Sequence, residues 1–329
     1  RVINASQNDV YDYTYNSGGN ITSVKLNGTV IKSYGYTDAT WKDLLKTFNG
    51  QPINYDEIGN PTSYRGMTMD WSYGRMLDTV IKSGQTIEYK YTDEGIRLQK
   101  KVAGQLTKYY VVDGVVLGEK TGTNKIIYYY DTNGTRYGFE YNGTKYYYVF
   151  NVQGDVISLI DANGAIVANY DYDAWGKILS ITDGNGNDVS TNQTHIANIN
   201  PIRYRGYYFD KETGFYSLQS RYYDPQTGRF LNADATVGKV GQIQGNNMFS
   251  YCFNNPVNMS DESGHWPKWV TATIAVVATV ATVVAVAVSA PVLVVAAVAT
   301  VAVVATVATV MPTKEEHYAR NEKNANVPS

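Results

Sequence analysis

The chain has 329 residues, 43% of them hydrophobic, so it is long enough to bury a sizeable core and is not a disordered tail. Lysine and arginine number 28 against 30 for aspartate and glutamate, a net charge of -2 that excludes the general positive field of a non-specific nucleic-acid binder. The 30 tyrosines and 29 glycines, which favour strands and turns respectively, predict an all-β fold.

The N-terminal part of the chain, 1–148, contains a short frame that recurs about every 20 residues. The frame is an aromatic residue, Asp or Asn, two variable residues and glycine; it occurs at 15–19, 55–59 and 130–134, and again at 172–176. Asp and Asn side chains bond their own backbone and glycine supplies a positive φ, so each copy predicts a β-turn between two strands. A two-stranded unit cannot bury its own face, and we therefore expect neighbouring repeats to stack.

The following part, 149–265, contains a second kind of turn. The pattern Asp-x-x-Thr-Gly occurs at 210–214 and at 224–228, and the second copy lies within the sequence RYYDPQTGRF, residues 221–230. Pro225 suits the second position of a type I turn, so we predict a hairpin here. Arg221 lies among apolar and aromatic residues and needs a carboxylate partner or an exposed position.

These residues resemble the tyrosine-aspartate (YD) repeats of the Rhs family, which is related to the teneurins and to the C components of insecticidal toxin complexes. The resemblance covers roughly residues 10–265 and is sharpest in an ordered series of motifs: YDYDAWG at 170–176, RYRGYYFD at 203–210, TGFY at 213–216 and RYYDPQTGRF. It implies a spiral of β-hairpins that forms a hollow, here partial, shell around a C-terminal toxin. Residues 149–265 would then be the repeat-associated core, which helps to close the shell.

The resemblance also implies a candidate catalytic site. Family members that cut their own chain use an arginine of the Arg-Tyr-Tyr-Asp-Pro stretch and two later aspartates, and the matching positions here are Arg221, Asp234 and Asp261. Two carboxylates held close together cannot both ionise easily, so one keeps a proton while the other activates water. The three residues are therefore expected to form an aspartyl site that acts once on its own chain.

The expected cut lies just after Gly264, between about His265 and Val270, and would free everything that follows. The sequence departs from the family's pattern at this end of the core. Ala235 and Glu262 follow the two aspartates where the family has proline, and Trp-Pro at 266–267 replaces a glycine-leucine end. The alternative is an inert core in which the two aspartates are structural.

Other chemistries find little support. The chain has no His-Glu-x-x-His, Cys-x-x-Cys or Gly-x-Ser-x-Gly motif, and we expect no metal site and no cofactor. The segment at 114–121 lacks the spacing of a phosphate loop, that at 183–188 lacks the glycine and glutamate of a calcium loop, and Cys252 has no nearby histidine. The tyrosine excess leaves one alternative function open, a carbohydrate-binding cell-surface module without cargo.

The segment 266–313 is apolar and is expected to form an α-helical hairpin. No charged residue occurs between Lys268 and Lys314, and Pro291 divides the run into two stretches of about 20 residues, the length that a helix needs to cross a bilayer. We therefore predict that 269–311 inserts into a membrane. The alternative is an apolar segment sheltered inside the shell, where its many valines favour β structure.

Both ends of the sequence predict a longer polypeptide. The first residues include no initiator Met and no apolar signal region, and the polar stretch 314–329 is too short for a toxin domain, so we expect it to be a linker to a missing effector. The predicted function is encapsulation and delivery of that effector by a secreted or cell-wall-associated polymorphic toxin. Its expected partners are its own toxin domain and a cognate immunity protein, with no nucleic acid for this portion.

Overall fold

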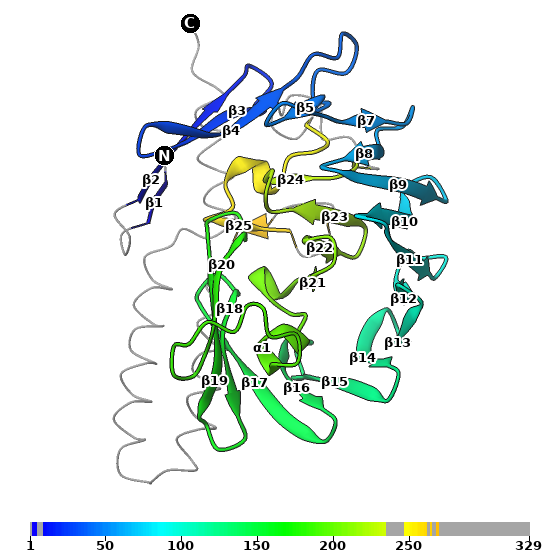
Figure 1. The fold of residues 1–329 in the computed structure, drawn as a ribbon, viewed down its shortest axis with the longest axis vertical. Coiled ribbons are helices and arrows are strands. Elements are labelled where there is room, and N and C mark those ends of the chain that lie inside the picture. Colours follow the sequence, from blue (N-terminus) through cyan, green and yellow to red (C-terminus); the bar gives the residue numbers. More distant parts are fainter. Residues whose placement is uncertain (1, 5–8, 235–246, 262–263, 265–267, 270–329) are drawn as a thin grey trace, which may run out of the picture. The chain divides into compact units, whose positions relative to one another are not determined.

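The computed structural model describes residues 2–4, 9–234, 247–261, 264 and 268–269, which belong to one compact unit, 1–271. Strands joined by short turns account for most of this unit (Figure 1). The one α-helix among the described residues, α1 (Ile196–Ile199), has four residues, and two short 3-10 turns, η1 (Tyr204–Gly206) and η3 (Cys252–Asn254), accompany it. The all-β prediction is confirmed for this part of the chain, whereas the boundary between 148 and 149 stays a prediction.

Two large antiparallel sheets are formed by strands that each pair with the next strand along the chain. The six-stranded sheet consists of β1 (Val2–Asn4), β2 (Asp9–Tyr15), β3 (Ile21–Leu26), β4 (Thr29–Gly35), β5 (Thr47–Phe48) and β6 (Gln51–Pro52). The fourteen-stranded sheet consists of β7 (Asn54–Tyr55), β8 (Pro61–Tyr64), β9 (Met67–Ser72), β10 (Met76–Lys82), β11 (Gln85–Tyr91), β12 (Arg97–Val102), β13 (Gln105–Val112), β14 (Val115–Thr121), β15 (Asn124–Tyr130), β16 (Arg136–Tyr141), β17 (Thr144–Phe150), β18 (Val156–Asp161), β19 (Ile166–Tyr172) and β20 (Ile178–Asp183).

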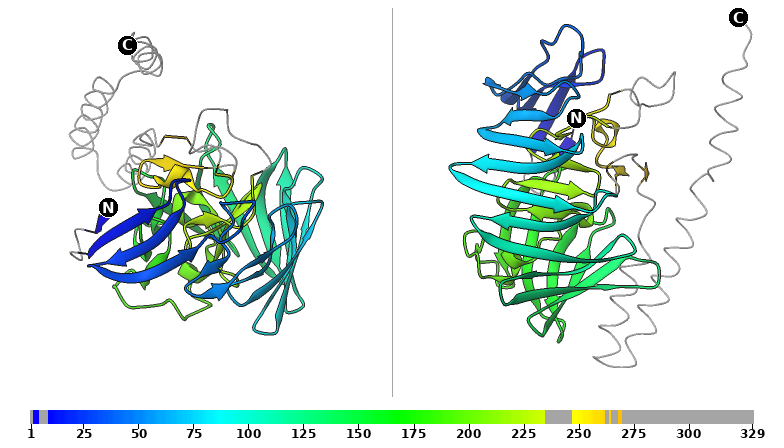
Figure 2. Two further views of the ribbon diagram at one scale, coloured as in Figure 1. Left: turned by 90° about the horizontal axis from the view of Figure 1, so that it is seen from above. Right: turned by 90° about the vertical axis from the view of Figure 1, so that its right-hand side faces the viewer.

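Two smaller sheets follow. One consists of β21 (Tyr208–Asp210), β22 (Phe215–Leu218), β23 (Arg221–Asp224) and β24 (Arg229–Phe230), and the other of β25 (Met259–Ser260) and β26 (Lys268–Trp269). In the pair β23 and β24, Tyr223 lies opposite Phe230, so RYYDPQTGRF forms the predicted hairpin. Figures 1 and 2 show β21 to β24 inside the curve of the fourteen-stranded sheet.

The repeat frame forms the predicted turn at all four positions, 15–19, 55–59, 130–134 and 172–176. The side-chain oxygen of the Asp or Asn accepts hydrogen bonds from the backbone N–H groups two and four residues later, at 2.8 to 3.1 Å. The glycine N–H bonds to the carbonyl of the same Asp or Asn, and the glycine φ lies between +77° and +86°. This φ range is unfavourable for any residue with a Cβ, which explains the glycine.

The frame tyrosines tie each repeat to the strand before it. Three of them, and also Tyr91 in the related stretch 91–95 where Thr92 replaces the Asp or Asn, donate hydrogen bonds from their hydroxyl groups to backbone carbonyls 10 to 16 residues earlier in the chain: Tyr55 to Leu45, Tyr91 to Leu77, Tyr130 to Val116 and Tyr172 to Val156. A phenol combines a large apolar surface with one polar atom that needs a partner when it is buried. The expected stacking of neighbouring repeats is therefore stabilised by both packing and hydrogen bonds.

The largest hydrophobic core joins the two large sheets to the core segment, by which we mean residues 203–234. One continuous cluster contains Ile21 and Val24 from the first sheet, Leu77, Val80, Ile87 and Tyr89 from the second, and Phe215, Tyr216, Tyr223 and Phe230 from the core segment. Burial of apolar surface is the main source of stability in such a cluster. The core segment therefore packs against both large sheets.

The predicted membrane hairpin, 269–311, and the predicted linker, 314–329, lie outside the described residues, except that Trp269 belongs to β26. In that short strand Lys268 and Trp269 pair with Ser260 and Met259 of β25. Among the described residues, no helix has the length and apolar character required to cross a membrane. Membrane insertion of 269–311 stays a prediction.

Candidate functional site

The structure brings together the three residues of the predicted catalytic site. Arg221 is the first residue of β23, and its Nη2 atom lies 2.9 Å from Asp234 Oδ2 and 3.6 Å from Asp261 Oδ2. All three side chains are buried; Asp261 is 1% exposed. The two aspartates, which are 27 positions apart in the sequence, thus approach the same guanidinium nitrogen.

The guanidinium of Arg221 is held on its other sides too. Nη1 donates a hydrogen bond to the Met248 carbonyl at 3.0 Å, and the group lies over the ring of Phe230 at 3.6 Å from the ring centre. Burial lowers the pKa of Arg221 to about 10, while the charges of Asp234 and Asp261 act in the opposite direction. Arg221 therefore stays positively charged at neutral pH and supplies the counter-charge for the two carboxylates.

Gly264 lies directly at this cluster. Its carbonyl oxygen accepts a hydrogen bond from Arg221 Nε, and its N–H donates to Asp261 Oδ1 at 2.9 Å. Its φ is +75°, and a Cβ atom at this position would lie 2.7 Å from the Leu218 carbonyl oxygen. Only glycine fits such a position without displacement of the backbone. Gly264, the residue just before the predicted cut, is thus held by Arg221 through its carbonyl group and by Asp261 through its N–H group.

A second set of buried charges was not predicted from the sequence. The Asp of each Asp-x-x-Thr-Gly turn is fully buried and pairs with cations from the fourteen-stranded sheet: Asp210 with Arg97 at 2.6 Å and Lys100 at 2.9 Å, and Asp224 with Arg65 at 3.0 Å. Burial would raise the pKa of Asp210, but the charges of Arg97 and Lys100 outweigh burial and hold the pKa below its ordinary value of 3.8. These pairs anchor the core segment to the sheet.

The remaining candidates have structural roles. In the segment 114–121, Gly114 belongs to a two-residue turn and the other residues form β14. The carboxylate of Asp183 accepts hydrogen bonds from the backbone N–H groups of Asn185 and Asn187, in a turn of the repeat type. Cys252 is completely buried, and burial raises the pKa of its thiol. In the described part of the chain, no three His, Cys, Asp or Glu side chains gather as a metal would require.

The arrangement at Arg221 has the components for hydrolysis of a neighbouring amide bond. Two carboxylates beside one amide can act as a base for water and as an acid for the leaving nitrogen. A donor on the carbonyl oxygen stabilises the negative charge that develops there. Arg221 Nε already bonds to the oxygen of Gly264, so the geometry supplies that third component as well.

The similarities to known proteins point to one architecture. A family model described as the teneurin YD-shell matches residues 117–257. The tRNA3(Ser)-specific nuclease WapA of Bacillus spizizenii is 37% identical over 270 residues, which are 78% of this chain and 11% of that protein. The double-stranded DNA deaminase toxin A of Burkholderia cenocepacia is 34% identical over 296 residues, 77% of this chain and 19% of that protein.

Solved structures give the same fold. TcdB2-TccC3 without its hypervariable C-terminal region superposes with a TM-score of 0.61 at 21% identity, over 78% of this chain and 13% of that chain. A crystal structure of TcdB2-TccC3 gives a TM-score of 0.56 at 19% identity, over 77% of this chain and 13% of that chain. The chain thus corresponds to a small section of each of these proteins.

Proposed function

This chain is an Rhs-type YD-shell protein, and from that premise we propose that it is the shell-forming section of a polymorphic toxin, enclosing an effector attached to its C-terminal side. One observation supports this most. Relatives named for unrelated chemistries, tRNA cleavage and DNA deamination, are similar to this chain over only 11% and 19% of their lengths. A section shared by such different enzymes is better suited to carry an effector than to perform its chemistry.

The fold is consistent with a container wall. Within each of the two large sheets every strand pairs with the next strand along the chain, and the ion pairs of Asp210 and Asp224 hold the core segment inside the curve of the fourteen-stranded sheet (Figure 1). In a chain that carries an effector after residue 329, the effector should resist trypsin while the shell is folded. The variant Asp224→Asn removes one anchor and should expose the effector, whereas Asp78→Asn, at a half-exposed pair with Lys90, should not. If trypsin digests the effector equally fast in the wild type and in both variants, encapsulation is contradicted.

We further propose that the core cuts the chain after Gly264. Asp234, whose carboxylate lies 2.9 Å from the guanidinium of Arg221, takes a proton from water as the water oxygen bonds to the carbonyl carbon of Gly264. Arg221 Nε stabilises the resulting oxyanion. Asp261 gives its proton to the nitrogen of residue 265 as the C–N bond breaks. The products are a new carboxyl group at Gly264 and a new amino group at residue 265, so the effector becomes a separate polypeptide within the shell.

Release of a toxic effector fits a protein that acts outside its own cell, so we propose a secreted or cell-wall-associated location and a cognate immunity protein as a partner of the effector. Neither assignment rests on this chain's own residues. A fractionated culture of the producing cells, probed with an antibody to the shell, tests the location. A signal confined to the cytoplasmic fraction would contradict it.

Carbohydrate binding is a second candidate function, and one surface feature favours it. Three partly exposed tyrosines form a row across β15, β16 and β17: Tyr129 and Tyr137 lie 6.0 Å apart between ring centres, and Tyr137 and Tyr147 lie 6.4 Å apart and nearly parallel. Aromatic rings in such rows can stack against sugars, although they also stabilise a sheet through cross-strand contacts. Binding on a glycan array that Tyr137→Ala abolishes would support this function.

A further inference from the structure

Arg203, in the core segment, is a buried cation with no carboxylate partner among the described residues. It is 2% exposed. Its Nε donates to the Asn200 carbonyl at 3.2 Å and its Nη2 to the Ala197 carbonyl at 2.7 Å, while the guanidinium lies over the ring of Tyr170. The remaining nitrogen, Nη1, is buried and makes no hydrogen bond to any described residue. The guanidinium is thus rigidly held with one donor group left unused.

This situation differs from that of the other buried cations described above. Arg97 and Lys100 share Asp210, Arg221 has Asp234, and Arg205 lies 3.6 Å from Asp155. A buried charge without a counter-charge is strongly unfavourable, since it has lost its hydration and gained little in return. An anion bound beside Arg203 would therefore be stabilised by a charge that the fold has already positioned.

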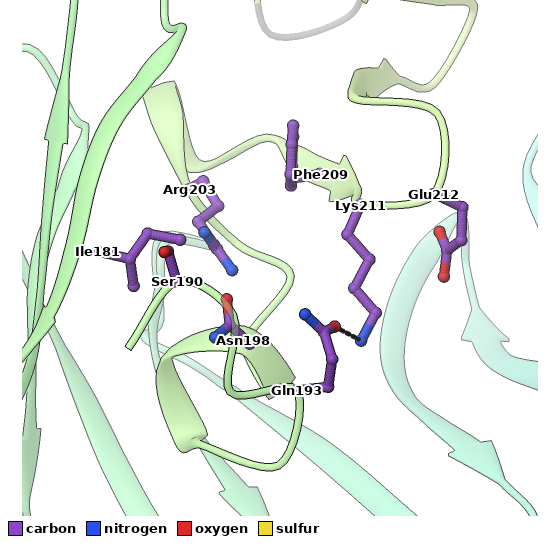
Figure 3. A pocket seen from close by; sticks show the side chains of 8 residues that line it. All are labelled: Ile181, Ser190, Gln193, Asn198, Arg203, Phe209, Lys211 and Glu212. Carbon is purple, nitrogen blue, oxygen red and sulfur yellow. Dashed lines mark hydrogen bonds between the residues drawn. The ribbon is translucent and has the colours of Figure 1, made fainter. Parts of the chain in front are cut away.

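Arg203 lines a cavity of about 340 Å³, shown in Figure 3. The side chains of Arg203 and Lys211 both extend into it, and Lys211 Nζ is oriented by a hydrogen bond of 3.0 Å to Gln193 Oε1. Ser190 contributes a neutral hydroxyl group to the wall. Glu212 is also part of the wall, but its carboxylate pairs with Lys100 at 3.0 Å.

The charges around the cavity are therefore unbalanced in favour of an anion. Glu212 is already neutralised by Lys100, which leaves the positive charges of Arg203 and Lys211 facing the same space. Partial burial lowers the pKa of Lys211, and the nearby charges of Lys100 and Arg203 lower it further while Glu212 raises it. An anion between the two cations would relieve their mutual repulsion.

We propose that this cavity is a binding site for a small oxyanion, which the positive charges of Arg203 and Lys211 attract, with Lys211 Nζ as a charged donor and the Ser190 hydroxyl as a neutral one. Charge-assisted hydrogen bonds, such as one from Lys211 Nζ to an oxyanion, are stronger than neutral ones. The cavity has room for a phosphate ion together with water. The site is separate from the Arg221 cluster and does not depend on encapsulation or on self-cleavage.

Calorimetric titration of the purified 329-residue chain with inorganic phosphate, in an oxyanion-free buffer, tests the proposal. We expect saturable one-site binding, and a thermal midpoint raised by roughly 3 °C when phosphate exceeds its dissociation constant about tenfold. Sodium chloride at matched ionic strength should give neither effect. Sodium acetate in a parallel titration shows whether a carboxylate is accepted as well as phosphate, and binding of either anion supports an oxyanion site.

Two lysine variants make the test specific. Lys211→Met should weaken anion binding about tenfold, whereas Lys108→Met, at an exposed position on β13, should leave it unchanged. Arg203→Met would also lose two hydrogen bonds to backbone carbonyls and is informative only if it folds. The test therefore uses Lys211→Met. Absence of saturable binding for both anions, or equal weakening by both lysine variants, would overturn the proposal.

Discussion

The guanidinium of Arg97, on β12, lies 2.6 Å from the carboxylate of Asp210, in the core segment, and both side chains are almost completely buried. Lys100, three residues after Arg97, contacts the other oxygen of the same carboxylate at 2.9 Å. The residues are more than 100 positions apart in sequence, 113 for Arg97 and Asp210. This contact thus fixes the core segment to the fourteen-stranded sheet.

Replacing Asp210 should therefore strongly destabilise the folded protein. In Asp210→Asn the buried guanidinium of Arg97 loses its carboxylate partner and Lys100 keeps only Glu212, and we expect the free energy of unfolding to fall by about 3–5 kcal/mol. Urea unfolding followed by tyrosine fluorescence measures it. Asp78→Asn is the matched control, because Asp78 and Lys90 are 3.5 Å apart and partly exposed, and a pair of that kind contributes about 1 kcal/mol or less. Similar losses in both variants would contradict the anchoring role of Asp210.

Glu119 predicts a dependence of stability on pH. Burial raises the pKa of this carboxyl group above its ordinary value of 4.5, although hydrogen bonds from Tyr208 and Tyr128 and the charges of Lys100 and Arg97 oppose the shift. A raised pKa in the folded state means that Glu119 favours folding when protonated, at low pH, and that this contribution is lost as the pH rises through the folded-state pKa. Relative to wild type, Glu119→Gln should therefore gain stability as the pH increases from about 4 to 8.

Unfolding of both proteins by urea at several pH values gives this difference directly. Other titrating groups cancel in the comparison, because they are present in both chains. A difference that stays constant, or that decreases with rising pH, would show that the pKa of Glu119 is not raised in the folded protein.

The frame tyrosines allow a test of the ties between repeats. Tyr172→Phe removes the hydroxyl group that donates to the Val156 carbonyl at 2.9 Å and leaves the ring in place. We expect a loss of about 1 kcal/mol in the free energy of unfolding, the usual contribution of one hydrogen bond. Tyr73→Phe, at a side chain that is 91% exposed, should have no measurable effect. If the two variants are equally stable, the hydroxyl of Tyr172 does not stabilise the stack.

Gly264→Ala should loosen the end of the core. The substitution imposes a strained positive φ and places a methyl group 2.7 Å from the Leu218 carbonyl oxygen and from Ser220 Oγ. Gly143→Ala is the matched control, since Gly143 has φ +90° and open space around its missing Cβ. Strain alone costs about 1–2 kcal/mol, so the control should show that loss and Gly264→Ala a larger one. Hydrogen exchange should also increase around Asp261 in Gly264→Ala only.

The turns, the hairpin at RYYDPQTGRF and the all-β fold could be predicted from local sequence patterns, because a turn depends on a few nearby residues such as Asp173 and Gly176. The resemblance to a family supplied Arg221, Asp234 and Asp261 as a group. The sequence does not reveal that Asp210 pairs with Arg97, because that contact depends on the stacking and register of strands far apart in the chain. The one available signal was that an Asp opened both Asp-x-x-Thr-Gly turns.

The cavity at Arg203 could not be predicted from the sequence for a similar reason. Nothing in the sequence RYRGYYFD indicates that Arg205 meets a carboxylate while Arg203 meets only backbone carbonyls and rings. Such a difference arises when the loop before η1 packs against β19 and β20. The fit of Gly264 against Leu218 is likewise a tertiary feature, since a glycine in a loop commonly marks only a turn.

Self-cleavage can be tested on the purified chain itself. Asp261→Asn changes one carboxylate to a nearly isosteric amide, and circular dichroism identifies any variant that fails to fold. Asp155→Asn is the control, because Asp155 is another buried carboxylate of the predicted core, 149–265, and pairs with Arg205 instead of Arg221. Folded Asp155→Asn should still cut its chain.

Intact mass spectrometry after prolonged incubation at neutral pH gives the decisive result. The wild-type chain of 329 residues, 36.5 kDa when intact, should appear as two polypeptides, the larger ending at Gly264. Asp261→Asn should remain a single polypeptide of full length. A folded wild-type chain that also remains intact at 36.5 kDa would contradict the protease and leave Arg221, Asp234 and Asp261 as a structural cluster that closes the shell.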